Sequence, residues 1–258
     1  MTTPFTLSNE QLQKLIDVVK QADTAILNIY NSSFTVEEKS DNSPLTEADK
    51  ASHAIITAGL AKLFPDIPVI SEEGDAVENE ATLETERFWL IDPLDGTKEF
   101  IHKNGEFTIC IALIENAQPA FGIISVPTKQ TVYYGGVHQP AMKQVGSSPA
   151  EPIHVASTPT NVVSVSKSHL SDATKGYVAR NFPTAKMVQA GSSLKAAMVA
   201  EGLVDANPTL DSGGMSLWDV AASHAIVEAA GGTVSRPNGD SITYSGPSLR
   251  IGDFVISR

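Results

Sequence analysis

The chain has 258 residues, of which 41% are hydrophobic and 19% charged, as is typical of a globular protein that buries a sizeable core. Its formal net charge of -12 argues against general nucleic-acid binding, which depends on many lysine and arginine contacts to phosphate. No stretch approaches the roughly 18 apolar residues of a membrane helix, and the N-terminus lacks the basic and apolar runs of a signal peptide. We therefore expect a cytoplasmic protein without an integral membrane segment, and leave open a peripheral association with the cytoplasmic face of the inner membrane.

The first half of the chain begins with helical patterns and continues with strand patterns. Ser8 and Gln11 match a capping box ahead of apolar residues at helical spacing, which predicts a long amphipathic helix to about residue 29. A turn at 41–44 is followed by Thr46, which can cap a second helix with Asp49 in its first turns. We expect a short strand at 67–70, a solvated acidic excursion at 75–86 and a buried strand at 88–91. Strands at 107–114, 121–126 and 131–135 are linked by short polar turns, which suggests that these three pair antiparallel. The single cysteine, Cys110, falls in one of these strands and fits the core.

The second half alternates between strands and helices. Residues 140–152 are rich in Gly, Ser and Pro and predict a connecting loop. Strands are expected at 162–165, 187–189 and 203–206, and helices at 171–181, 193–201 and 218–230. We predict an α+β fold class with two parts. Residues 1–145 form an N-terminal α+β half with an antiparallel sheet and a metal-binding motif, and residues 146–258 form an α/β half that completes the active site.

The run from Trp89 to Thr97 carries the strongest chemical signal. An apolar strand ends at a turn containing Pro and Gly, which places Asp92 and Asp95 at the end of a core strand. Like charges held close together raise each other's pKa and destabilise the fold unless a cation or protons neutralise them. With Glu72 added, the oxygen ligands favour Mg²⁺ or Mn²⁺ over zinc. Taken alone, the same string also fits an Asp-capped turn.

Several separated segments resemble the inositol monophosphatase superfamily and, within it, the bacterial 3'(2'),5'-bisphosphate nucleotidases of the CysQ type. They lie at residues 41–49, 71–73, 89–100, 104–108, 166–169, 191–195 and 218–222, so the resemblance covers nearly the whole chain. It implies a layered αβαβα sandwich of the inositol monophosphatase and sugar phosphatase type. It also implies a phosphomonoesterase that hydrolyses the 3'-phosphate of adenosine 3',5'-bisphosphate to AMP and phosphate, requires Mg²⁺, is inhibited by lithium and serves sulfur assimilation.

The resemblance also implies a role for individual residues. Two or three Mg²⁺ ions, with Mn²⁺ as a substitute, would be held by Glu72, Asp92, the Leu94 carbonyl, Asp95 and Asp219. Asp49 and Thr97 would be catalytic, with Thr97 orienting the attacking water and passing on its proton. The substrate-binding residues would be Glu72, Leu94, Asp95, Gly96, Thr97, Lys167, Ser192, Lys195 and Asp219.

Some interpretations stay open at this level. Where the nucleotidases carry Tyr-Pro-Arg, this chain has Asn207, Pro208 and Thr209, so a guanidinium contact to substrate phosphate is missing. An inositol monophosphate or another small sugar phosphate is therefore the alternative substrate, and a non-catalytic, metal-dependent nucleotide sensor is a second alternative. Asp49 and Asp219 also fit plain helix-start acids, and Lys167 and His169 also fit a surface loop. The partner is expected to be a small phosphorylated substrate, and the chain a monomer or homodimer.

Overall fold

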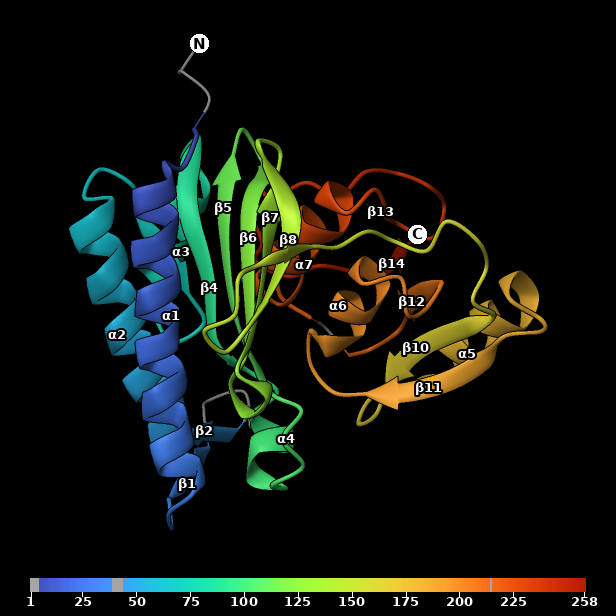
Figure 1. The fold of residues 1–258 in the computed structure, drawn as a ribbon, viewed down its shortest axis with the longest axis horizontal. Coiled ribbons are helices and arrows are strands. Elements are labelled where there is room, and N and C mark those ends of the chain that lie inside the picture. The colour runs from blue at the N-terminus through green and yellow to red at the C-terminus, as the bar shows by residue number, and fades with distance from the viewer. Residues whose placement is uncertain (1–4, 39–43, 214) are drawn as a thin grey trace.

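The computed structural model describes residues 5–38, 44–213 and 215–258, which form alternating layers of helices and sheets (Figure 1). Helices α1 (Asn9–Tyr30) and α2 (Glu47–Leu63) cover one face of a seven-stranded sheet. Helices α6 (Leu194–Ala200) and α7 (Trp218–Ala229) lie between its other face and a five-stranded sheet, which α5 (Asp172–Asn181) covers on the outside. The predicted layered sandwich is confirmed.

Both N-terminal helices begin where the sequence places their caps. The Ser8 hydroxyl accepts from the Gln11 N–H while the Gln11 side chain accepts from the Ser8 N–H, and Thr46 with Asp49 forms the same capping box at α2. The segment before α2 contributes a small antiparallel pair, β1 (Val36–Glu38) and β2 (Pro44–Thr46). Of the turn predicted at 41–44, only Pro44 lies within the described residues.

The large sheet follows the chain order from β3 to β9. Its strands are β3 (Val69–Ser71), β4 (Arg87–Asp95), β5 (Thr108–Glu115), β6 (Gln118–Val126), β7 (Thr131–Gly136), β8 (Gln139–Val145) and β9 (Glu151–Pro152). Strands β3 and β4 are parallel and the remaining neighbours antiparallel. The loop predicted at 140–152 is wrong, because β8 and β9 occupy its two ends. Strand β8 buries only Ala141 among mostly polar residues, so its sequence carries little strand periodicity.

The acidic segment at 75–86 is not the solvated excursion that we predicted. It forms helix α3 (Ala76–Leu83), and the Asp75 carboxylate caps it by accepting from the N–H groups of Val77 and Glu78. Asn79 and Leu83 are buried on its inner face. Two buried residues in one short acidic helix are too few to show as an apolar period in the sequence.

Strand β4 is buried on both faces and thereby positions the acidic residues that follow. Trp89 and Ile91 pack in the core beneath α1 and α2, whereas Phe88 and Leu90 pack in the core on the side of α6 and α7. Because successive side chains of a strand alternate between faces, Asp92 continues the α7 side.

The smaller sheet has the order β11-β10-β12-β14-β13. Strand β10 (Val162–Ser166) is parallel to β11 (Lys186–Ala190) and β12 (Ala206–Thr209), as is typical of strands that alternate with helices. Strand β14 (Phe254–Ser257) pairs antiparallel with β12 and with β13 (Thr233–Ser235), and neither β13 nor β14 was predicted. The strand expected at 203–206 begins instead at Ala206, because Leu203 lies in a turn with 55% of its surface exposed.

Helix α7 lies unusually close to the large sheet. A Cβ added at Gly122 of β6 would come within 2.4 Å of the Ala222 carbonyl oxygen. This close approach brings the start of α7 beside the end of β4, where the candidate site lies. No helix in the described ranges is long and apolar enough to cross a bilayer. The division of the chain at residue 145 stays a prediction.

Candidate active site

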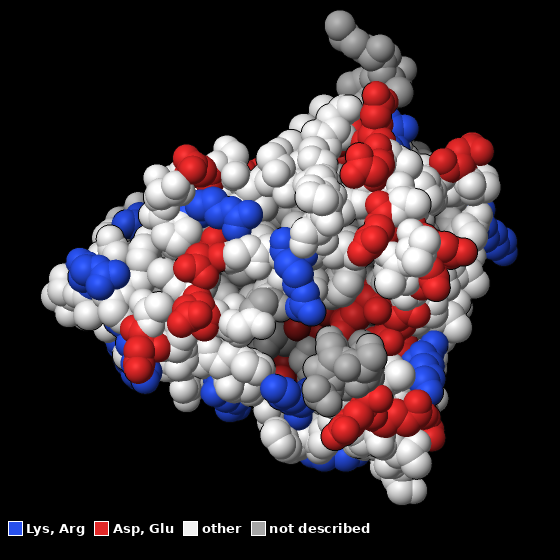
Figure 2. Space-filling model, turned by 180° about the vertical axis from the view of Figure 1, so that it is seen from behind, with Lys and Arg blue, Asp and Glu red and all other residues white. Residues whose placement is uncertain are grey.

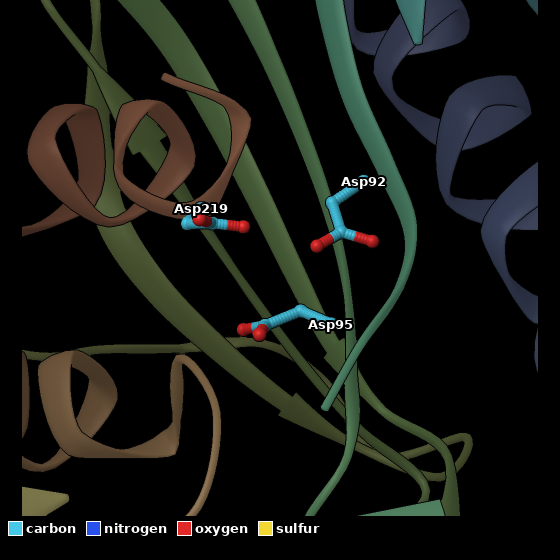
Figure 3. A group of neighbouring side chains, drawn as sticks. All are labelled: Asp92, Asp95 and Asp219. Carbon is cyan, nitrogen blue, oxygen red and sulfur yellow. The ribbon is translucent and has the colours of Figure 1, made fainter. Parts of the chain in front are cut away.

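Three aspartates meet between the large sheet and α7. Asp92 and Asp95 come from the end of β4, and Asp219 comes from the first turn of α7. Each offers a carboxylate oxygen, and these oxygens lie within 4.8 Å of one another. Figure 3 shows the three side chains pointing toward a shared space. The structure thus places these three predicted residues together, although more than 120 positions separate Asp95 from Asp219 along the chain.

The cluster is unfavourable for three ionised groups. Burial raises the pKa of Asp92 well above its usual range, and the charges of Glu72, Asp95 and Asp219 raise it further. Burial followed by the charge of Asp95 raises the pKa of Asp219 to about 8. A divalent cation would offset this repulsion, and a set of carboxylate oxygens suits a hard ion such as Mg²⁺. The residues present therefore fit a metal of this class.

Asp95 is held in a fixed orientation by hydrogen bonds to one of its two oxygens. Its Oδ2 accepts from Thr108 Oγ1 at 3.1 Å, from Ser192 Oγ at 2.8 Å, and from Ser193 N and Oγ at 2.7 Å each. Within the described part of the chain no hydrogen bond to Oδ1 is found. Oδ1 is therefore the oxygen that Asp95 can offer to a cation.

The turn that joins β4 to α4 (Thr97–Ile101) is fixed from both sides. The Leu94 N–H donates to Asp92 Oδ1 at 2.9 Å, and the Pro93 carbonyl accepts from Ser52 of α2 at 2.7 Å. Gly96 has a φ of 93°, in the left-handed region that glycine adopts without steric cost, and α4 begins at the next residue.

Thr97 and Asp49 form a second polar pair beside this turn. Asp49 is 2% exposed and accepts from the Thr46 N–H at 2.8 Å and from the Thr46 hydroxyl at 2.6 Å through Oδ2. The Thr97 hydroxyl lies 3.3 Å from Asp49 Oδ1 and donates to it. Asp49 is therefore fixed by Thr46 through Oδ2, and its Oδ1 is linked to the pocket by the Thr97 hydroxyl.

A pocket of about 380 Å³ opens beside the carboxylates. Its lining includes the acidic residues Glu72, Asp95 and Asp219. It also includes two lysines and one histidine, Lys98, Lys195 and His169. Figure 2 shows acidic side chains in a hollow of this face with basic side chains around its rim. With a metal ion bound to the carboxylates, the pocket would present mainly positive charge. Such a pocket suits a negatively charged phosphate ester.

Two of the basic side chains are restrained. Lys195 is 9% exposed, its Nζ donates to the Ser192 carbonyl at 2.5 Å, and burial lowers its pKa. His169 Nε2 lies 3.0 Å from Lys98 Nζ, and burial together with this cation lowers the pKa of the imidazole. His169 is therefore neutral and accepts from Lys98, which keeps the lysine ammonium at the pocket.

The structure brings most of the predicted site residues to one place. Seven of them line the pocket: Glu72, Asp95, Gly96, Thr97, Ser192, Lys195 and Asp219. Asp49, Asp92 and Leu94 lie directly behind them through the contacts described above. Lys167 is not among the lining residues, because its Nζ pairs with Glu106 at 3.1 Å. Its contact with substrate stays a prediction.

The residues that orient these groups have no distinct signal in the sequence. Thr108, Ser193 and Glu106 fall within the segments at 104–108 and 191–195, where the first two fix Asp95 and the third accepts from the Gly191 N–H at 2.9 Å. Their partners lie 13 to 98 positions away in sequence, so spacing gives no signal for them. Thr209 also lies in the pocket, where it pairs across strands with Phe254 of β14.

Comparison with known proteins gives consistent results. Residues 8–254 match the model of the inositol monophosphatase family. The 3'(2'),5'-bisphosphate nucleotidase CysQ of Salmonella typhimurium is 39% identical over 236 residues, which cover 91% of this chain and 94% of that protein. The crystal structure of CysQ from Bacteroides thetaiotaomicron has a TM-score of 0.81 and 34% identity, with 96% and 97% of the two chains covered. The Thermotoga maritima IMPase has a TM-score of 0.78 and 26% identity, with 96% and 92% covered.

Proposed function

The chain belongs to the inositol monophosphatase family, and we propose that it is a Mg²⁺-dependent 3'(2'),5'-bisphosphate nucleotidase. It hydrolyses the 3'-phosphate of adenosine 3',5'-bisphosphate to AMP and phosphate. The observation that carries this proposal is the three-aspartate cluster at the end of β4, which opens on a pocket containing Thr97 and Lys195. Two or three ions, with Mn²⁺ as a substitute, are expected at Glu72, Asp92, the Leu94 carbonyl, Asp95 and Asp219.

Bound Mg²⁺ supplies positive charge to the phosphate and lowers the pKa of water near it. The protein supplies orientation and a path for the proton. Because the Thr97 hydroxyl donates to Asp49, its oxygen lone pairs face away from Asp49 and can accept a hydrogen bond from the attacking water. When the water attacks phosphorus, its proton passes to Thr97 Oγ1 while the threonine proton moves to Asp49, and the bond between phosphorus and the 3' oxygen breaks. The 3' oxygen leaves as part of AMP and takes a proton from solvent water.

Lys195 and the neighbouring turn act on the phosphate itself. The Lys195 ammonium is fixed by the Ser192 carbonyl at the pocket wall, so it can contact phosphate oxygens without losing much side-chain freedom on binding. Its charge also opposes the repulsion that a protein with a net charge of -12 exerts on an anionic substrate. Gly96, Ser192 and the Thr97 N–H are the remaining groups proposed to contact substrate.

A nucleotide substrate is favoured over an inositol ester on two grounds. The relatives that are 34–39% identical carry the nucleotidase or CysQ name, whereas the Thermotoga protein described as an IMPase is only 26% identical. The pocket also extends past the carboxylates to Met215, Phe254 and Ile256, whose apolar surface suits a nucleoside. The sensor alternative is weaker, because a binding protein has no need of the Thr97–Asp49 pair.

The first experiment compares phosphate release from adenosine 3',5'-bisphosphate and from inositol 1-phosphate with Mg²⁺, with and without lithium. We expect strong preference for the nucleotide and loss of activity with lithium. Preference for the inositol ester would keep the chemistry and replace the substrate. Metal and nucleotide binding without phosphate release from either compound would favour the sensor.

The variant Asp95→Asn tests the metal cluster directly. We expect it to abolish turnover while the protein stays folded, because the amide keeps the shape of the side chain but loses the charge that binds the cation. The matched control is Asp66→Asn, the same change at an exposed position outside the pocket, which should leave turnover unaffected. Unchanged turnover in Asp95→Asn would contradict the proposed role.

Further aspects of the resemblance accompany the proposal. They are the role in sulfur assimilation, the cytoplasmic location with or without peripheral membrane association, and the monomeric or homodimeric state. Each stays a prediction that depends on the proposed activity.

A further inference from the structure

The turn at 191–193 has an uncommon backbone conformation beside the metal cluster. Ser192 has a φ of 55°, in the left-handed region that residues with a Cβ adopt only with backbone strain. On one side of this residue the Gly191 N–H points at Glu106, and on the other side the Ser193 N–H points at Asp95. The reversal at Ser192 allows the N–H groups of the residues on either side of it to donate to two different carboxylates.

Three donors from this turn orient Asp95. They are Ser192 Oγ, Ser193 N and Ser193 Oγ, all within 2.8 Å of Oδ2. These bonds keep Oδ2 occupied and leave Oδ1 directed at the metal cluster. A turn that stores backbone strain keeps this shape only if its surroundings hold it there.

Glu106 is the residue that holds the turn from the opposite side. Its Oε2 accepts from the Gly191 N–H at 2.9 Å, and its Oε1 pairs with Lys167 at 3.1 Å. The contact is close as well as polar, because a Cβ added at Gly191 would lie 2.6 Å from Glu99 Cγ and 2.8 Å from the Glu106 carbonyl oxygen. The segment from Glu99 to Glu106 and the 191–193 turn therefore fit together only with glycine at position 191.

We propose that Glu106 is a positioning residue for the metal site, which acts through the Gly191 N–H and the 191–193 turn on the orientation of Asp95. This inference rests on the proposed function, because it assumes that Asp95 holds a divalent cation. It assigns Glu106 no contact with metal or substrate. Its effect is on how well the cluster binds metal before any substrate is present.

The test is Mg²⁺ titration by calorimetry on substrate-free protein, with thermal unfolding as a check of folding. Glu106→Ala removes the acceptor, and we expect Mg²⁺ affinity to fall about tenfold, as for loss of other outer-shell partners of metal ligands. Glu106→Gln keeps an oxygen that can accept from Gly191, so its affinity should stay within about twofold of the unchanged protein. The matched control Glu151→Ala removes an exposed glutamate of β9 and should bind Mg²⁺ normally.

Gly191→Ala provides an independent arm that alters no charge. The added methyl group pushes the turn away from Glu99 and Glu106, so we expect the same loss of Mg²⁺ affinity. If Glu106→Ala does not fold, Gly191→Ala alone tests the proposal. Normal affinity in both Glu106→Ala and Gly191→Ala would overturn the inference and leave the proposed function intact. Equal losses in Glu106→Gln and Glu106→Ala would also overturn it, because the charge and not the hydrogen bond would then matter. Absence of Mg²⁺ binding in the unchanged protein would overturn the proposed function itself.

Discussion

The direction of one hydrogen bond defines what Thr97 can do. Asp49 Oδ2 accepts from Thr46, and the Thr97 hydroxyl is the donor toward Asp49 Oδ1. The threonine oxygen then has only acceptor capacity to offer to the pocket. This arrangement orients a water molecule and would be of little use for binding a phosphate oxygen, which needs a donor.

Replacing Thr97 by Val removes the hydroxyl and keeps the shape of the side chain. We expect kcat to fall by about 10²- to 10³-fold with little change in KM, because general acid–base assistance contributes on this scale. Thr97→Ser keeps the hydroxyl and should retain most of the activity. Steady-state kinetics on both variants, with Mg²⁺ affinity measured separately, checks the prediction. A Val variant with normal kcat would exclude Thr97 from the proton path.

The sequence identified the residues of the cluster better than the residues that orient them. Asp92 and Asp95 lie at a predictable strand end, and the alternation of β4 side chains places Asp92 on the α7 face. Glu106 and Gly191 are 85 positions apart, and their contact depends on how the two sheets are placed relative to each other. That placement follows from tertiary packing, which no local pattern records.

At the scale of whole elements, α7 carries Asp219 to the site because it can lie almost on the backbone of β6. Gly122 and the small residues Ala221, Ala222 and Ala225 allow this close packing. Since Asp92 and Asp95 belong to the sheet and Asp219 to the helix, the distance between these two elements sets the geometry of the metal cluster.

Gly122→Ala should therefore damage both stability and the metal cluster. The added Cβ would meet the Ala222 carbonyl at 2.4 Å, so α7 must move, at a cost of about 1–3 kcal/mol in unfolding free energy and with loss of Mg²⁺ affinity. The same substitution at Gly176 of α5 is the control, because the nearest atom there is the flexible end of Arg180. Gly176→Ala should stabilise the protein by about 0.5–1 kcal/mol through helix propensity. Urea unfolding measures the unfolding free energy of both variants. A Gly122→Ala variant as stable as the unchanged protein would contradict the packing argument.

Elements with local signals were predicted, and elements that depend on distant partners were not. Helices α1 and α2 begin at caps formed by residues three positions apart, and strand β4 is a continuous apolar run. Strand β14 has no such local sequence signal, because its position is set by antiparallel pairing with β12 and β13. Helix α3 was missed because its few buried residues stand in an acidic segment.

At the scale of the whole molecule, a buried acid joins the outer helix layer to the large sheet. Asp23 of α1 is 8% exposed, and its Oδ2 accepts from the Ser125 hydroxyl of β6 at 2.7 Å. Its Oδ1 is buried without a hydrogen-bond partner among residues 5–38, 44–213 and 215–258. Burial therefore raises the pKa of Asp23 from its usual 3.8 to about 7, with smaller opposing effects of Ser125 and Lys20.

This raised pKa makes the stability of the protein depend on pH. Between pH 3.8 and about 7 the folded protein keeps the Asp23 proton while the unfolded chain loses it, so unfolding becomes easier as the pH rises and then levels off above pH 7. The interval between the two pKa values corresponds to roughly 4 kcal/mol of unfolding free energy. Asp23→Asn is neutral at every pH and keeps an oxygen for Ser125, so it should lack this decline.

Urea unfolding at pH 5 and pH 8 provides the measurement. As the pH rises, the stability of Asp23→Asn should increase relative to that of the unchanged protein. Comparing the two proteins at each pH cancels the contributions of the other titrating groups. Asp17→Asn alters an exposed aspartate of the same helix and is the matched control. A pH-independent difference for Asp23→Asn would mean that Asp23 is ionised in the folded protein. The layer of α1 and α2 would then have to accommodate a buried charge whose only hydrogen bond within the described residues is to Ser125.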